Sequence, residues 1–221
     1  MLRPCGFAPP MSFVPDPSVL VAFVGATLLL AVTPGPDMTL FLGRTLAQGR
    51  ASGLAVIAGT TTGCLMHTVL VALGVSALIN ASASAFLVLK LAGALYLLWL
   101  AFQAIRGGSS FALTVDRKRR PLWREFANGW AVNALNPKIV LFFVAFLPSF
   151  VSATDPDATG KLLFLGVLFA FVALPIMVPM VFVAEALTDT LRRNPKIARV
   201  MDYVFATVFA GFAVSILTTQ R

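Results

Sequence analysis

The 221-residue chain carries 58% hydrophobic and only 12% charged side chains, whereas a soluble domain has about 45–50% apolar and about 25% charged residues. Such scarce polar surface excludes a water-soluble globular protein, a disordered chain and a disulfide-rich secreted scaffold. The 17 Lys and Arg residues exceed the 9 Asp and Glu residues, giving a net charge of +8. In a membrane protein this excess is typical of cytoplasmic loops, so we expect the lipid bilayer, and no nucleic acid, as a partner.

Long gaps between charged residues predict an all-α, polytopic membrane protein. Crossing the hydrocarbon core takes about 20 mostly apolar residues in a helix. The stretches that satisfy this are residues 18–42, 51–79, 86–105, 126–150, 162–185 and 200–219. Runs such as 142–147 are apolar at every position, whereas a membrane-spanning β-strand alternates between apolar and polar. We therefore predict six transmembrane helices.

The predicted spans divide the chain into two three-helix halves. Prolines make the beginning of the chain a poor helix, and Met11 is an alternative start that would make residues 1–10 an extension without a structural role. The predicted units are an N-terminal tail (1–17), a first half (18–105), a basic cytoplasmic loop (106–125) and a second half (126–221).

Basic residues predict how the helices are oriented, because cytoplasmic loops are rich in Lys and Arg. Twelve of the 17 fall in the first, third and fifth connections: Arg44 and Arg50; Arg106, Arg117, Lys118, Arg119, Arg120 and Arg124; Arg192, Arg193, Lys196 and Arg199. The second connection has no charge. We therefore place these three connections in the cytoplasm and both termini outside. The run 117–120 is interpreted as membrane-orienting and lipid-facing rather than as a nucleic-acid patch.

Two predicted spans contain residues that cannot continue a helix. Span one contains Pro34, Gly35 and Pro36, and span four contains Asn136 and Pro137 near its middle. Each proline lacks a backbone donor, and Pro36 disfavours a helical Gly35. Each break lies in the first span of its half, which predicts two inverted repeats with a binding site between them. The alternative is a pair of ordinary proline kinks.

A charged residue directly follows each break. Asp37 starts a half-helix whose positive dipole end favours an anion, and Lys138 occupies the equivalent place after Pro137. A buried lysine there needs an acceptor, which could be Asp37, a backbone carbonyl or a substrate carboxylate. Asn133 and Asn136 add polar groups at the same depth. Together with the prolines and Gly35, these residues are the predicted substrate-binding or coupling site.

Span two carries a stripe of Ala55, Gly59, Gly63 and His67 at helical spacing. Small residues at this spacing let another helix approach closely, so Gly59 and Gly63 are predicted packing positions. His67 is the only histidine. It is interpreted either as a packing residue or as a proton relay.

Several segments in order resemble the lysine exporter (LysE/RhtB) superfamily of amino-acid efflux proteins. They are Thr33–Asp37, Arg44, Gly49-Arg50, Gly53-Leu54, the Gly59, Gly63 and His67 stripe, Lys90–Leu100, Asn133, Asn136–Lys138 and Phe142–Pro148. The resemblance implies a bacterial inner-membrane exporter of amino acids or their derivatives, coupled to the proton gradient. The family accepts Asn or Asp after its PGP motif. The substrate, the stoichiometry and assembly into a homo-oligomer stay open.

Other classes of function lack the residues they need. A membrane-embedded oxidoreductase needs a cysteine pair, but Cys5 and Cys64 are far apart in the sequence. An intramembrane hydrolase needs a nucleophile with a base or a metal, and His67 has no second histidine to assist it. A scaffold subunit would have no reason to keep Asp37 and Lys138 at broken helices. We therefore expect a transporter without cofactor, metal or enzymatic activity, with a membrane-embedded enzyme as the alternative.

Overall fold

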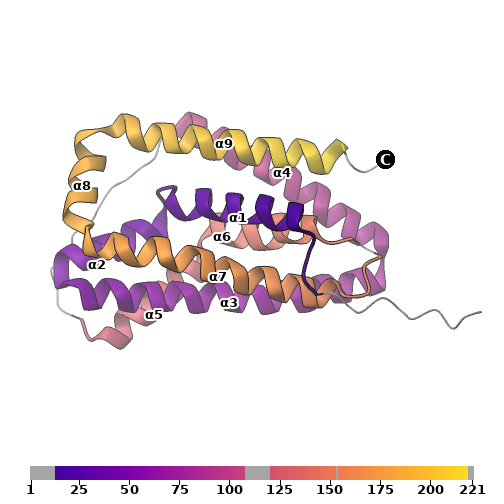
Figure 1. Ribbon diagram of the computed structural model, residues 1–221, viewed down its shortest axis with the longest axis horizontal. Helices are drawn as coiled ribbons and strands as arrows, with labels where there is room; N and C mark the ends of the chain where they lie inside the picture. Colours follow the sequence, from indigo (N-terminus) through magenta and orange to yellow (C-terminus); the bar gives the residue numbers. More distant parts are fainter. Residues whose placement is uncertain (1–12, 108–119, 153, 219–221) are drawn as a thin grey trace, which may run out of the picture.

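The computed structural model describes residues 13–107, 120–152 and 154–218, and within these ranges every regular element is a helix (Figure 1). The all-α prediction is confirmed. The predicted extension 1–10, Met11 and the run Arg117–Arg119 lie outside the described residues. The α-helices are α1 (Pro17–Val32), α2 (Pro36–Gln48), α3 (Arg50–Ala81), α4 (Ala83–Gly107), α5 (Leu122–Leu135), α6 (Pro137–Leu141), α7 (Ala158–Phe182), α8 (Ala184–Arg193) and α9 (Pro195–Thr218).

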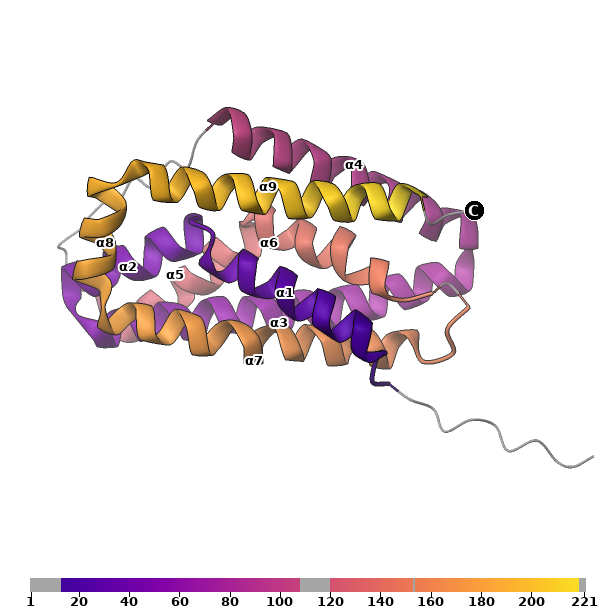
Figure 2. The same ribbon diagram turned by 45° about the horizontal axis from the view of Figure 1, so that its top comes forward.

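The helices form three layers, which the two views in Figures 1 and 2 show consistently. Helices α4 and α9 pack together on one side, and α3 packs with α5 and α7 on the other. Helices α1 and α6 lie between these layers. The connections α2–α3 and α7–α8 meet at one end of the molecule, and the start of α1 and the end of α9 lie at the opposite end (Figure 1).

Helices α1 and α2 form one broken segment, bent by 48°. Gly35 is extended at the break and precedes Pro36, the first residue of α2. After α2 the chain turns at Gly49, whose φ of 91° lies in the left-handed region that favours glycine. The break and the turn therefore both follow from residues visible in the sequence.

Helix α5 and the segment Pro137–Phe150, which begins with α6, form the second broken segment, bent by 53°. Asn136 occupies the break, and its side chain caps α6 by accepting from the backbone N–H of Lys138. The chain then continues through a π-helix, η1 (Phe142–Phe146), and a 3₁₀-helix, η2 (Leu147–Phe150). These irregular turns follow the proline break.

Length and apolar composition identify candidate membrane spans in the described part of the chain. The segments Arg50–Val75 and Ala158–Phe182 qualify on their own, and each bent pair is a further candidate for one broken span. Beyond α7 the chain bends at Val183, and α8 runs crosswise to α7 (Figure 1). The predicted span 162–185 therefore ends earlier, at Phe182.

Phenylalanine rings fill the centre of the bundle. Phe142 lies 4.9 Å from Phe146 and 5.1 Å from Phe169, measured between ring centroids. Phe23 from α1 and Phe209 from α9 contact the same cluster at 5.9 and 6.3 Å. Such aromatic pairs add about 0.5–1.5 kcal/mol each beyond their buried area, so η1 holds the layers together.

Two glycines allow α3 and α5 to meet backbone to backbone. A Cβ on Gly59 would overlap the carbonyl of Phe126, and a Cβ on Gly129 would overlap the carbonyl of Val56. No larger residue fits at either position without moving a helix. This close contact fixes where α5 ends relative to α3, and thus positions the residues of the second break.

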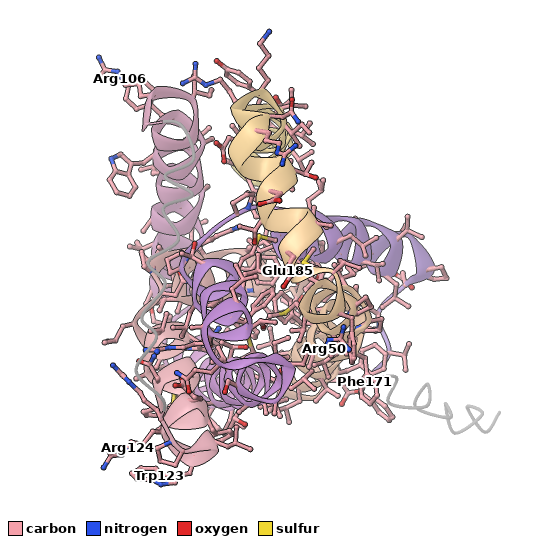
Figure 3. All side chains as sticks on the ribbon, turned by 90° about the vertical axis from the view of Figure 1, so that its left-hand side faces the viewer. Arg50, Arg106, Trp123, Arg124, Phe171 and Glu185 are labelled. Atoms are coloured by element: carbon pink, nitrogen blue, oxygen red, sulfur yellow. The ribbon has the colours of Figure 1, made fainter. Side chains whose placement is uncertain are left out.

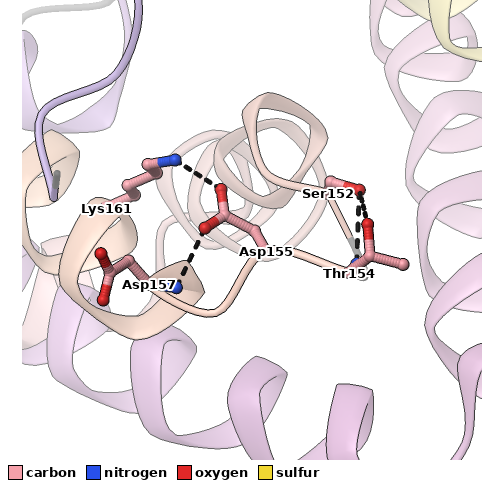
Figure 4. Close-up of polar contacts among 5 residues, drawn as sticks. All are labelled: Ser152, Thr154, Asp155, Asp157 and Lys161. Carbon is pink, nitrogen blue, oxygen red and sulfur yellow. Dashed lines mark hydrogen bonds and ion pairs between the residues drawn. The ribbon is translucent and has the colours of Figure 1, made fainter. Parts of the chain in front are cut away.

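A short polar network connects the loop after η2 to the first turn of α7 (Figure 4). The Lys161 ammonium lies 2.6 Å from one Asp155 carboxylate oxygen, and the backbone N–H of Asp157 donates to the other at 3.0 Å. The partial burial of Asp155 acts to raise its pKa. The two hydrogen bonds and the attraction of the Lys161 charge outweigh that effect and hold the pKa below its ordinary value.

Candidate functional site

Asp37 lies in the first turn of α2, directly after the first break. The side-chain amide of Asn133 donates to one of its carboxylate oxygens at 2.7 Å, and that of Asn136 donates to the other at 3.1 Å. Both asparagines are buried, with at most 3% of their surface exposed. The end of α5 therefore binds the beginning of α2.

Lys138 lies in the first turn of α6, directly after the second break. Its ammonium donates to the carbonyls of Thr33 at 2.9 Å and Leu30 at 3.3 Å. The last carbonyls of a helix lack helical partners and form the negative end of its dipole. The acceptor that the sequence demands for this lysine therefore includes the C-terminal end of α1.

The two breaks hold each other's charged residues. Asp37 of the first break binds amides of the second, and Lys138 of the second binds carbonyls of the first. The charges of Asp37 and Lys138 also attract each other. Charged side chains inside a membrane protein are costly unless they are paired or hydrogen-bonded. The hydrogen bonds between the two breaks and the attraction between the two charges reduce that cost for both side chains.

A cavity of about 50 Å³ lies beside these charges. One water molecule needs about 10–15 Å³ on the same measure, so the cavity holds a few waters in this conformation. Its polar lining includes Thr33, Gly35, Asp37, Asn133, Asn136 and Lys138. The apolar lining includes Met38, Phe41, Phe169, Ala170, Ala173 and Met177. We call this space the central cavity.

Of the other predicted residues, Pro36 and Pro137 each begin a half-helix, and Pro34 lies in the first break. Gly63 faces the cavity residue Asn133, since a Cβ on Gly63 would lie 2.5 Å from its side-chain oxygen. His67 is buried but does not line the cavity. Its ring lies 5.8 Å from that of Phe143 and contacts the backbone of Asn133.

Cys64 is a cavity residue that the sequence reasoning did not place there. Its sulfur lies 3.7 Å from the side-chain oxygen of Asn133 and 3.6 Å from the nitrogen. Cys64 is buried and lies one turn of α3 before His67. Its position three residues before His67, on the same face of α3, is the signal that could have found it.

A buried ion pair near the α2–α3 turn was also missed. The Nε atom of Arg44 lies 3.2 Å from the carboxylate of Glu125, whose side chain is fully buried. Gln48 donates to Glu125 at 3.1 Å and accepts from the backbone N–H of Arg120 at 2.9 Å. Glu125 lies among basic residues in the sequence, so the sequence favours an exposed position for it in the loop.

Asp202 is a second buried carboxylate near the charged centre. It lies on α9, is 5% exposed, and its charge acts on Lys138. In the sequence Asp202 falls just before the apolar stretch of the last helix, where an exposed end residue is expected. The packing of α9 against its neighbouring helices buries this carboxylate instead.

Apolar helices of membrane-spanning length around an internal cavity with two charged side chains are typical of membrane transport proteins. The chain belongs to the LysE type translocator family, which it matches over residues 28–220, and this confirms the resemblance seen in the sequence.

Named relatives agree with this membership. A homoserine/homoserine lactone efflux protein of Salmonella typhimurium is 30% identical over 85% of this chain and 90% of its own length. A leucine efflux protein of Klebsiella pneumoniae is 26% identical over 91% and 95%. An uncharacterized membrane protein of Vibrio cholerae is 28% identical over 93% and 99%. No solved structure matches the chain.

Proposed function

We propose that this protein exports a neutral amino acid across the bacterial inner membrane. The observation that carries the proposal is that one carboxylate, Asp37, and one ammonium, Lys138, line the same internal cavity with otherwise uncharged residues. A zwitterion with an uncharged side chain complements this lining. The relatives named for leucine and homoserine efflux support the same substrate class.

Each charge has a distinct role in binding. Asp37 receives the α-ammonium of the substrate, and Lys138 receives the carboxylate together with the backbone N–H groups at the start of α2. In the empty site Asn133 and Asn136 hold Asp37, and the carbonyls of α1 contribute to holding Lys138. The backbone N–H of Lys138 already donates to the side chain of Asn136. Helix α6 therefore binds the substrate through the Lys138 side chain.

Substrate passage requires the cavity to open, because about 50 Å³ holds only a few waters. The two broken segments, α3, α4, α7 and α9 would form six spans as two inverted halves, 18–105 and 126–221, joined by the basic loop 106–125. The bends of 48° and 53° at matching places support this arrangement. Rocking of one half against the other would then expose the site alternately.

The proposed topology places both termini outside and the α2–α3 and α7–α8 connections in the cytoplasm. The clustering of these connections at one end of the molecule supports it. Single cysteines at Ser82 and Thr159 should react with an impermeant maleimide from outside, and one at Asp189 only after the membrane is opened. Reaction of all three from the same side would contradict the topology.

Proton coupling is the proposed energy source. Asp37 accepts the proton when no ammonium occupies it, and His67, whose charge acts on Asp37, tunes that exchange. Asp37→Asn should keep partial export with an altered pH dependence, since the family accepts Asn here. Export by Asp37→Asn that follows the wild-type pH profile would contradict this role.

A toxicity screen tests the function directly. The protein is expressed in a bacterial strain that lacks its own amino-acid exporters, and the strain is challenged with leucine, homoserine, lysine and analogues of each. Relief from leucine or homoserine, but not from lysine, is expected. Relief from lysine alone would contradict the neutral substrate, and relief from none would contradict export.

A further inference from the structure

A second cavity, of about 540 Å³, lies at the end of the molecule where α2 meets α3 and α7 meets α8. Arg50 from α3 and Glu185 from α8 both line it. Figure 3 looks at this end and shows the two residues on either side of the α7–α8 corner. We call it the access groove.

The two charged residues of the groove are exposed and of opposite sign. The Arg50 guanidinium lies over the ring of Phe182, 5.2 Å from its centroid. A guanidinium stacked on a ring keeps its edge N–H groups for a carboxylate. In the described part of the chain no ion pair is found between Arg50 and Glu185, so both are open to a ligand.

Part of the groove lining is apolar. Phe182 and Val183 are 50% and 53% exposed, although both line the groove. A binding site for a small molecule combines such an apolar surface with a few placed polar groups. The groove therefore offers a cation, an anion and an apolar strip to one ligand.

The groove and the central cavity share two helices. On α2, Met38 and Phe41 line the cavity, and Thr45 lines the groove one turn later. On α7, Met177 lines the cavity, and Val181 lines the groove one turn later. The two spaces therefore lie along one seam between α2 and α7.

A small apolar cluster separates the two spaces. Met38, Phe41, Leu42 and Val181 pack together, each at most 4% exposed. The groove lining on α2 and α7 is thus one helical turn from the cavity lining, and this layer of side chains lies between the two spaces. Displacement of α7 from α2 would join the groove to the cavity.

We propose that the access groove binds the zwitterionic head of the amino acid before it reaches the central cavity, with Arg50 on the carboxylate and Glu185 on the ammonium. The proposal rests on the proposed function, which places this end in the cytoplasm. An ammonium beside an anionic group also occurs in phosphatidylethanolamine, so the experiment must separate the amino acid from that lipid.

Protection of a groove cysteine from a maleimide measures ligand binding without requiring transport. Ala186, an exposed groove residue, is changed to Cys in the full chain carrying Cys5→Ser, in nanodiscs without phosphatidylethanolamine. L-leucine should slow the reaction with a maleimide, and Arg50→Gln or Glu185→Gln should raise the protecting concentration about tenfold, as expected for a lost charged hydrogen bond.

Matched controls exclude a general effect of charge. Arg106→Gln removes a guanidinium that also lies over a ring, Phe102, at 4.9 Å, but on α4 away from the groove (Figure 3). Asp189→Asn removes an exposed acid of α8 outside the groove. Both controls should keep the wild-type protection. Equal losses in the controls, or no protection by leucine in the parent protein, would overturn the proposal.

Competing ligands assign the two ends. L-leucinamide lacks the carboxylate, so Arg50→Gln should not change its protecting concentration. 4-Methylpentanoate lacks the ammonium, so Glu185→Gln should not change its protecting concentration. Protection by phosphatidylethanolamine in place of leucine would overturn the assignment to an amino acid. Leucine uptake by everted vesicles is measured in parallel: protection without uptake refutes the export function alone, and uptake without protection refutes the groove alone.

Discussion

The side-chain amide of Asn133 binds the carboxylate of Asp37 at 2.7 Å, across 96 residues of sequence. This bond joins the end of α5 to the start of α2, so each break is held by the other. Because Asn133 also contacts Cys64, three helices meet at one amide. The geometry of the proposed site therefore depends on Asn133.

Replacing Asn133 should impair export without removing either charge. Asn133→Ala leaves one Asp37 oxygen without its donor, and an unsatisfied buried group costs about 1–3 kcal/mol. We expect export to fall about tenfold or more. Asn128→Ala, on the same helix and partly exposed, is the control. Export by Asn133→Ala at the rate of that control would contradict the role of the amide.

Gly59→Ala should destabilise the fold. Its methyl group would overlap the backbone carbonyl of Phe126, and overpacking a tight contact costs about 1–3 kcal/mol. Gly74→Ala on the same helix has nothing within 4 Å, so its melting temperature in detergent should match the wild type or exceed it. Equal melting temperatures of the two variants would show that α3 and α5 are not in backbone contact.

Removing one partner of the buried ion pair should be more harmful than removing both. Glu125→Ala removes the carboxylate that pairs with Arg44, and removing one partner of a buried ion pair costs about 3–5 kcal/mol. The double variant Arg44→Met with Glu125→Leu should recover much of that loss. Asp189→Ala, which breaks the exposed pair with Arg193, should cost less than about 1 kcal/mol. Additive losses in the double variant, seen by thermal unfolding, would contradict the pairing.

The Asp155 network should make stability fall in acid. The folded-state pKa of Asp155 lies below its unfolded value, which is about 3.9. Its contribution is therefore present above that value and disappears as the pH falls through the lower, folded one. The melting-temperature gap between wild type and Asp155→Asn should be constant near neutral pH and shrink below about pH 4. A melting-temperature gap that widens in acid would contradict a stabilising role of the ionised Asp155 carboxylate.

The sequence alone predicted the helical class. It also predicted where both breaks lie, because proline lacks the backbone N–H that a helix interior needs. It also selected Asp37, Asn133, Asn136 and Lys138 as candidates, because polar groups inside membrane spans are costly, and the structure brings all four to the lining of one cavity. The apolar stretches located α3 and α7 to within a few residues of their observed ends.

Contacts between distant segments could not be predicted in the same way. Which acceptors Lys138 uses depends on the bend between α1 and α2, and the burial of Glu125 and Asp202 depends on how α5 and α9 pack. The crosswise course of α8 depends on a bend at Val183, which carries no proline or glycine. Such features arise from tertiary packing rather than from local pattern.

The most direct test of the central claim is uptake of radiolabelled L-leucine by everted membrane vesicles that contain equal amounts of wild type, Asp37→Ala or Lys138→Ala. We predict that wild type accumulates leucine when a proton gradient is imposed and that both variants lose accumulation, because each leaves one end of the zwitterion without its partner. Wild-type accumulation by Asp37→Ala would contradict the claim that this carboxylate binds the exported amino acid.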